Sequence, residues 1–238
     1  MSRVEIQEAR IEYTVQRRKP KKGPRALRGS AKRRTITVLE DVNLTLRAGD
    51  RVALIGPNGA GKTSLLRAIS GMLPPTAGRI TVEGRLLSLI NNTEGLIGYV
   101  DLFENARLFG LLNGIPAESV APYAREVLAL SRLDDKAGMP MNSLSTGMRG
   151  RFNIALLDPL RAQIVVMDEW IGTTDNKVIK RSKGLLADML ADVDIFILAT
   201  HRQSIAATHC NRAVLLNEGR IEQFEGVDEA FVRYEQIV

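Results

Sequence analysis

Cysteine is almost absent from this 238-residue chain, whose single Cys210 can form no internal disulfide, so a reduced, cytosolic setting is the natural expectation. No apolar run reaches about 18 residues, so the sequence offers no transmembrane helix. The first ten residues, MSRVEIQEAR, lack the apolar stretch of a signal peptide. The 45% hydrophobic and 25% charged residues are ordinary for a globular protein, and the length suffices for a real core.

Acidic residues are missing from residues 17–34, which read RRKPKKGPRALRGSAKRR and hold ten basic residues. Because the whole chain carries only +6, the remainder carries −4, and the high isoelectric point belongs to this segment. Its prolines and glycines predict an exposed insertion between two strands. Anionic phospholipid is one candidate partner, and a solvated loop without a partner is the alternative. Nucleic acid is not expected, since no aromatic residues interleave the charges.

Strand-like and helix-like segments alternate along the chain, which indicates an α/β fold. We expect strands at 4–13, 35–46, 51–55, 164–167 and 194–200, one or two strands over 79–90, and a hairpin over 213–224. We expect helices at 62–72, at 148–157, at 177–190 and from Asp228, and two helical runs within 104–133 that Gly114 and Pro116 separate. The apolar run at 164–167 is typical of a strand buried on both faces of a parallel sheet.

The motif GPNGAGKT at residues 56–63 follows an apolar strand, begins a helix and fits the P-loop pattern G-x-x-x-x-G-K-[ST]. Its glycines allow backbone N–H groups to wrap a phosphate, and the helix N-terminus adds partial positive charge. Lys62 is expected to neutralise the β- and γ-phosphates of ATP, and Thr63 to offer its hydroxyl to Mg²⁺. A chance glycine-rich turn is the alternative, which the flanking elements disfavour.

Two acids, Asp168 and Glu169, follow the strand at 164–167, at the carboxyl edge where α/β sheets bind ligands. We expect Asp168 to hold Mg²⁺ through water. Glu169 is expected to act as the general base that polarises the attacking water. An apolar run that ends in two acids is weak evidence alone, but a P-loop earlier in the chain strengthens it.

The sequence LSTGM at residues 144–148 resembles the signature motif of ABC ATPases. Ser145 and the Gly147 amide stand at an expected helix N-terminus, where an anion can bind, although an ordinary serine-capped helix is the alternative. The order of the motifs is similar to that of ABC transporter ATP-binding subunits. That resemblance implies a homodimer with two sandwiched ATP molecules, each held by one P-loop and the partner's signature.

The same resemblance implies roles for three isolated residues. His201 stands where the family keeps a switch histidine that contacts the γ-phosphate and the attacking water. Asp175, six residues after Glu169, matches the loop aspartate that reaches across the dimer. Tyr13, expected just after the first strand, stands where the family places an aromatic that stacks on adenine. His209 has no such position.

The implied fold is the P-loop ABC ATPase fold, a RecA-like core with an antiparallel β subdomain and a helical subdomain at about 91–150, in a single domain over 1–238. The candidate residues are Glu169 and His201 for catalysis; Tyr13, Gly56, Pro57, Asn58, Gly59, Ala60, Gly61, Lys62, Thr63 and Ser64 for ATP; Leu144, Ser145, Thr146, Gly147 and Met148 for the partner's ATP; Asp175 for the dimer loop; and Thr63 and Asp168 for Mg²⁺.

Three features resemble the polysaccharide-exporting branch of the family: Trp170 after the acid pair, the segment 95–116 with its Glu-Asn pair, and the basic insertion. This branch exports lipid-linked O-antigen, capsule or teichoic acid through a separate membrane permease. It implies a peripheral subunit on the cytoplasmic face of a bacterial inner membrane. An exporter ATPase for another substrate and a soluble, non-transport ABC ATPase are the alternatives.

The chain also departs from the family pattern. The usual glutamine before the helical subdomain is missing; Asn91, Asn92 and Glu94 lie near its place, and a solvated loop there is equally compatible. Asn211 stands where the family commonly has aspartate. After the expected last helix, no room remains for a C-terminal carbohydrate-binding domain, and none is expected.

Overall fold

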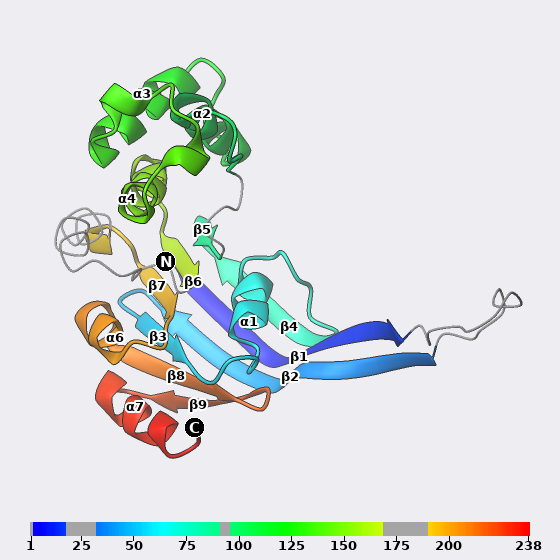
Figure 1. Cartoon of the computed structure of the whole chain (residues 1–238). Helices are drawn as coiled ribbons and strands as arrows, with labels where there is room; N and C mark the ends of the chain where they lie inside the picture. The colour runs from blue at the N-terminus through cyan, green and yellow to red at the C-terminus, as the bar shows by residue number, and fades with distance from the viewer. Residues whose placement is uncertain (1, 18–31, 91–95, 169–189) are drawn as a thin grey trace, which may run out of the picture.

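The computed structural model describes residues 2–17, 32–90, 96–168 and 190–238 (Figure 1). Its strands are β1 (Arg3–Arg17), β2 (Lys32–Arg47), β3 (Arg51–Ile55), β4 (Ala77–Glu83), β5 (Leu86–Leu89), β6 (Ile164–Asp168), β7 (Ile195–Ala199), β8 (Arg212–Asn217) and β9 (Arg220–Phe224). Its α-helices are α1 (Lys62–Ile69), α2 (Leu102–Leu112), α3 (Val120–Ser131), α4 (Thr146–Leu157), α6 (Gln203–His209) and α7 (Val227–Glu235). Within these ranges, no helix combines the length and apolar character needed to cross a bilayer.

The central sheet has six strands in the order β5-β6-β7-β3-β8-β9, and β9 alone runs antiparallel to its neighbour. Strands β6 and β7 are buried along both faces, as predicted for the apolar run at 164–167. Alternate residues of β6 face opposite sides of the sheet. Val166 packs into the core that contains α1, and Val165 packs into the core that contains α2, α3 and α4. Helices α6 and α7 cover the same face as Val165, where they pack over β3 and β8.

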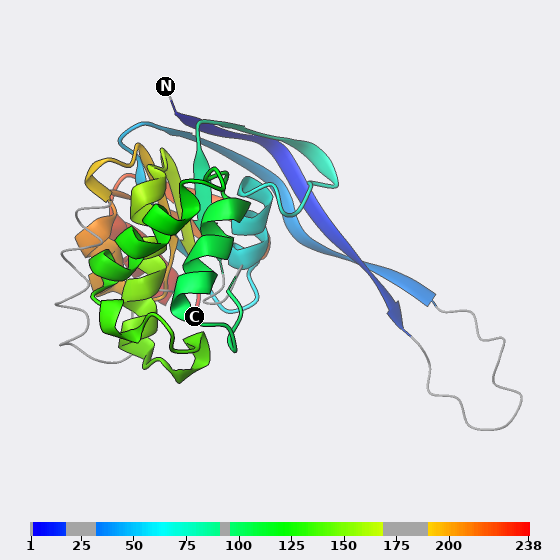
Figure 2. The ribbon, with the colours of Figure 1, turned by 90° about the horizontal axis from the view of Figure 1, so that it is seen from above.

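A second sheet of three antiparallel strands, β2-β1-β4, shares a core with α1. Strand β1 pairs with β4 only as far as Arg10, while its pairing with β2 continues to Arg17 and Lys32. A two-stranded ribbon therefore extends past β4 and projects from the body (Figure 2). The strand predicted at 4–13 is too short, because backbone pairing with β2 carries β1 into the basic segment, of which residues 18–31 lie outside the described ranges.

Helices α2, α3 and α4 form a layer at the β5–β6 end of the central sheet (Figure 1). Tyr123 of α3 is buried and donates its hydroxyl to the Leu156 carbonyl of α4 at 2.6 Å. Burial raises the pKa of this phenol. Gly110 lets α2 approach α3 closely, since a Cβ there would lie 2.7 Å from the Tyr123 ring. The two helical runs predicted within 104–133 are thus confirmed as α2 and α3, which pack closely where Gly110 meets Tyr123.

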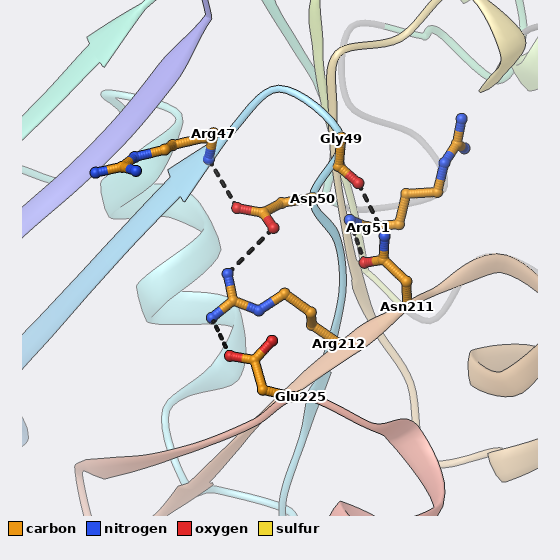
Figure 3. Close-up of polar contacts among 7 residues, drawn as sticks. All are labelled: Arg47, Gly49, Asp50, Arg51, Asn211, Arg212 and Glu225. Atoms are coloured by element: carbon orange, nitrogen blue, oxygen red, sulfur yellow. Dashed lines mark hydrogen bonds and ion pairs between the residues drawn. The ribbon is translucent and has the colours of Figure 1, made fainter.

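Side chains complete the backbone hydrogen bonds where β3 begins (Figure 3). The Asn211 side chain accepts a hydrogen bond from the Arg51 N–H and donates one to the Gly49 carbonyl, both at 2.9 Å. Beside it, Arg212 forms an ion pair with Asp50 at 3.1 Å. These contacts fix the turn before β3 to the start of β8.

One helix ends earlier than the pattern predicts. The helix expected over 62–72 stops at Ile69, because Gly71 adopts a left-handed conformation with φ of +72°. The Gly71 N–H bonds back to the Ala68 carbonyl, and the Met72 N–H to the Arg67 carbonyl. These bonds close the last turn of α1.

Three further predicted or observed elements complete the comparison between sequence and structure. Residues 79–90, expected to hold one or two strands, contain most of β4 and all of β5, which belong to different sheets and are separated at Gly84, with φ of +119°. Helix α6 is an element that the pattern does not predict. The helix expected at 177–190 lies almost wholly outside the described residues.

Replacing Asn211 by the aspartate that the family commonly has should destabilise this chain. A carboxylate can still accept from the Arg51 N–H, but it cannot donate to the Gly49 carbonyl. We expect Asn211→Asp to lower the free energy of unfolding by about 0.5–1.5 kcal/mol in urea denaturation at pH 7, since the lost hydrogen bond is exposed to solvent. Asn142→Asp, at an exposed asparagine, is the matched control and should change it little. Equal effects of the two variants would contradict this account of Asn211.

Candidate functional site

The P-loop, residues 56–61, joins the carboxyl end of β3 to the N-terminus of α1. Three of its glycines have positive φ: +146° at Gly56, +83° at Gly59 and +108° at Gly61, which is the N-cap of α1. The first turn of α1 contains no acidic residue. A curled, glycine-rich backbone that leads into a helix N-terminus is an anion-binding geometry, so the loop fits the phosphates of a nucleotide.

The Lys62 side chain lies over this loop and is only 8% exposed. Its ammonium group donates to the Gly56 carbonyl at 2.7 Å and to the Pro57 carbonyl at 3.1 Å. The positive charge is therefore held against the loop that would wrap the phosphates, where low exposure limits screening by solvent.

Thr63 and Asp168 meet although 105 positions separate them in the chain. The Thr63 hydroxyl donates to Asp168 Oδ2 at 2.7 Å, and Asp168 is the last residue of β6. A hydroxyl and a carboxylate are the hard oxygen ligands that Mg²⁺ takes, few in number and completed by phosphate and water. The pair fits Mg²⁺. In the described part of the chain, no larger group of His, Cys, Asp and Glu gathers that could hold another metal.

Tyr13 lies within β1, opposite Ile36 of β2, and not after the first strand as expected. The strand continues because its ladder with β2 runs on for four more residues to Arg17. The Tyr13 hydroxyl is 3.3 Å from the Ser64 hydroxyl, in the first turn of α1. The ring is 37% exposed, so the ribbon presents an accessible aromatic surface beside the P-loop helix.

His201 follows β7, which lies between β3 and β6 in the sheet. It lines a pocket of about 340 Å³ together with Pro57 and Asn58 of the P-loop. Tyr234 of α7 and Val238 complete the lining. No motif or spacing in the sequence points to these last two residues, because only the packing of α7 beside β3 brings them to the P-loop.

The signature residues begin a different helix. Ser145 is the N-cap of α4, and its hydroxyl accepts a hydrogen bond from the Met148 N–H at 3.3 Å. Leu144 is buried, and Thr146 is exposed. Helix α4 packs into the core of the helical layer, whereas α1 packs into the core on the opposite face of the central sheet (Figure 1). Within one chain, the two candidate phosphate sites therefore start on opposite sides of the sheet.

Several predicted residues fall outside the described ranges. They are Glu169, Trp170 and Asp175 after β6, and Asn91, Asn92 and Glu94 before the helical layer.

The lone cysteine is no candidate nucleophile for this site. Burial raises the pKa of the Cys210 thiol to about 12, so the thiol is protonated at neutral pH.

The profile of the family described as ABC transporter matches residues 39–172, more than half of the chain. The O-antigen export system ATP-binding protein RfbE of Yersinia enterocolitica is 33% identical over 187 residues, which cover 79% of this chain and 78% of RfbE. The teichoic acids export ATP-binding protein TagH of Listeria innocua is 26% identical over 209 residues, or 88% of this chain and 62% of TagH.

An import protein is also similar. The spermidine/putrescine import ATP-binding protein PotA of Haemophilus ducreyi is 31% identical over 199 residues, or 79% of this chain and 53% of PotA. The chain thus spans less than two thirds of TagH and of PotA.

Among solved structures, the dimeric structure of a post-hydrolysis state of the ATP-binding cassette MJ0796, bound to ADP and Pi, has a TM-score of 0.73 at 22% identity. The match covers 94% of this chain and 98% of that one. This likeness confirms the predicted fold class, the P-loop ABC ATPase fold.

Two P-loop glycines should differ in what they contribute to stability. A Cβ at Gly56 would lie 2.1 Å from the Leu216 carbonyl oxygen of β8, whereas a Cβ at Gly59 meets nothing within 4 Å. Gly59→Ala should cost about 1–2 kcal/mol, from its left-handed backbone alone. Gly56→Ala should cost roughly 3 kcal/mol or more, because the clash adds to the strain. Chemical denaturation without nucleotide measures both, and a Gly56→Ala protein as stable as Gly59→Ala would contradict the packing.

Proposed function

Because the chain is an ATPase of the ABC transporter family, we propose that it powers the export of a lipid-linked polysaccharide through a separate membrane permease. The observation that carries the substrate class is the similarity to RfbE, an O-antigen export protein, over four fifths of this chain. The similarity to TagH, a teichoic acids export protein, supports the same class. Trp170, the segment 95–116 and the basic insertion agree with it.

Import of a small cation is the second candidate. PotA is named for spermidine and putrescine import and is nearly as similar as RfbE. The three branch features above favour export of a polysaccharide over this alternative. A non-transport ABC ATPase has no relative among those described above to support it.

In the proposed reaction, the P-loop binds the phosphates of ATP and Lys62 neutralises charge on the β- and γ-phosphates. Tyr13 stacks on adenine, a role that its exposed ring beside Ser64 supports. Thr63 and, through water, Asp168 would hold Mg²⁺, which would neutralise charge on the phosphoryl group. Most of the catalysis then consists of positioning and electrostatic stabilisation.

Hydrolysis requires a base for the attacking water. We assign this role to Glu169, which follows Asp168 directly in the sequence. Its carboxylate takes the water proton as the water oxygen bonds to the γ-phosphorus and the bond to the ADP oxygen breaks. His201 orients the γ-phosphate and the water, and its place in a pocket with Pro57 and Asn58 supports this role.

Each ATP site is proposed to need two chains. The P-loop of one chain binds ATP, and residues 144–148 of a second chain bind the γ-phosphate at the N-terminus of α4, with Asp175 reaching across the interface. The opposite-face placement of α1 and α4 supports a site shared between chains.

The proposed dimer works at the cytoplasmic face of a bacterial inner membrane, bound to the permease. We also propose that the basic segment 17–34 contacts anionic lipid there, since ten positive charges without an acid favour such a surface. Flotation with phosphatidylglycerol vesicles tests this contact. Equal binding to neutral phosphatidylcholine vesicles argues against it.

Glu169→Gln should separate binding from turnover. The amide cannot accept the water proton, so ATP hydrolysis should fall by roughly 100- to 10,000-fold while ATP affinity stays close to that of the parent. Phosphate release and titration with a fluorescent ATP analogue measure the two quantities. Glu218→Gln, at another acidic position, is the control. Parent-level turnover in Glu169→Gln would refute the assigned role.

The substrate class is tested in the source organism by replacing the chain with Glu169→Gln. Failure of export should deplete surface polysaccharide and accumulate polymer on its lipid carrier inside the cell. Uptake of labelled spermidine should be unchanged. Normal surface polysaccharide with lost spermidine uptake would favour the import alternative.

A further inference from the structure

Asn105, the fourth residue of α2, is completely buried, although its side chain is polar. Its oxygen accepts a hydrogen bond from the Ile97 N–H at 2.7 Å. Its nitrogen donates to the carbonyls of Ile97, Val100 and Asp101 at 3.0, 2.9 and 2.9 Å. One amide side chain therefore organises the backbone of the loop that precedes α2. A buried polar network of this kind rigidifies its surroundings when all its members are satisfied.

The loop held by Asn105 is bonded in turn to a second segment, residues 137–143. The Asn142 N–H donates to the Gly98 carbonyl at 2.8 Å, and the Met141 N–H to the Val100 carbonyl at 3.0 Å. Asp101 and Pro140 form an antiparallel bridge. The two segments thus form a short, two-stranded backbone connection.

This second segment leads directly into the signature. The Leu144 N–H bonds to the Met141 carbonyl at 3.3 Å, and the Leu144 side chain is buried in the core of the helical layer. Ser145 follows as the N-cap of α4. Only three residues separate Met141, which is bonded to the loop, from Ser145, so a shift of the loop moves the N-cap.

We propose that Asn105 is a positioning residue for the signature. By holding the loop at 97–101, it sets segment 137–143 and therefore the place of Ser145 and the N-terminus of α4. This proposal rests on the proposed two-chain ATP site, in which the N-terminus of α4 receives the partner's ATP. It predicts that Asn105 affects the second chain's nucleotide while leaving the chain's own P-loop untouched.

A purely local role makes a different prediction. If Asn105 served only to satisfy its own loop, its loss would loosen 97–101 and leave 139–148 and the dimer unchanged. The two roles are therefore separable by measurements outside the loop.

The test variant is Asn105→Asp, which keeps the size and the acceptor for the Ile97 N–H but removes the donor to three carbonyls. The matched control is Asn113→Asp at the other end of α2, where the side chain donates only to the Phe109 carbonyl of its own helix, at 2.8 Å. Asn105→Ser, which retains one donor, is prepared in parallel and carries the test if Asn105→Asp does not fold.

The first readout is amide hydrogen exchange without nucleotide. In Asn105→Asp, peptides covering both 97–101 and 139–148 should exchange faster than in the parent. In Asn113→Asp they should not. Faster exchange confined to 97–101 would overturn the proposal, whether or not the chain dimerises.

The second readout is ATP-dependent dimerisation in a Glu169→Gln background, followed by analytical ultracentrifugation. Adding Asn105→Asp should raise the protein concentration at half-dimerisation by roughly 2- to 30-fold. The affinity of the monomer for a fluorescent ATP analogue should stay unchanged. An unchanged midpoint would overturn the proposal. A Glu169→Gln parent that never dimerises would instead defeat the proposed two-chain site, and the exchange readout would still decide the role of Asn105.

Discussion

The register of β7 between β3 and β6 is the constraint on which the ATP site depends. Ala199 of β7 pairs with Leu54 on one side and with Asp168 on the other. Because the three strands are parallel and in step, Gly56, Asp168 and His201 leave the sheet at one edge. The hydrogen bond between Thr63 and Asp168 follows from this register. Gly56 also packs closely against the Leu216 carbonyl, so the position of the P-loop depends on β8 as well.

The same sheet also divides the functional parts of the chain. The P-loop helix α1 packs on one face, with the antiparallel sheet, and α4 packs on the other, with α2 and α3. A phosphate at the N-terminus of α1 therefore lies away from the N-terminus of α4 in the same chain. A second copy can supply the missing helix terminus, and the contacts of Asn105 offer a physical route by which the helical layer keeps that terminus in place.

The parts of the site that could be predicted from sequence are those coded by local patterns. The P-loop, β3, β6 and the N-cap Ser145 each have a short signature of residue types. The continuation of β1 past Tyr13 could not be predicted, because pairing with β2 across a long insertion extends the strand to Arg17. Tyr234 in the His201 pocket and the hydrogen bonds of Asn105 come from tertiary packing, which no spacing in the sequence encodes.

The most direct test of the shared site is complementation between two inactive proteins. Lys62→Ala disables the P-loop, and Ser145→Arg blocks the N-terminus of α4, so each protein alone should hydrolyse almost no ATP. Mixed at equal concentrations, they should recover up to about a quarter of the parent rate, because each mixed dimer contains one intact P-loop facing one intact signature. A mixture as inactive as its components, under conditions where the chains exchange, would contradict the account.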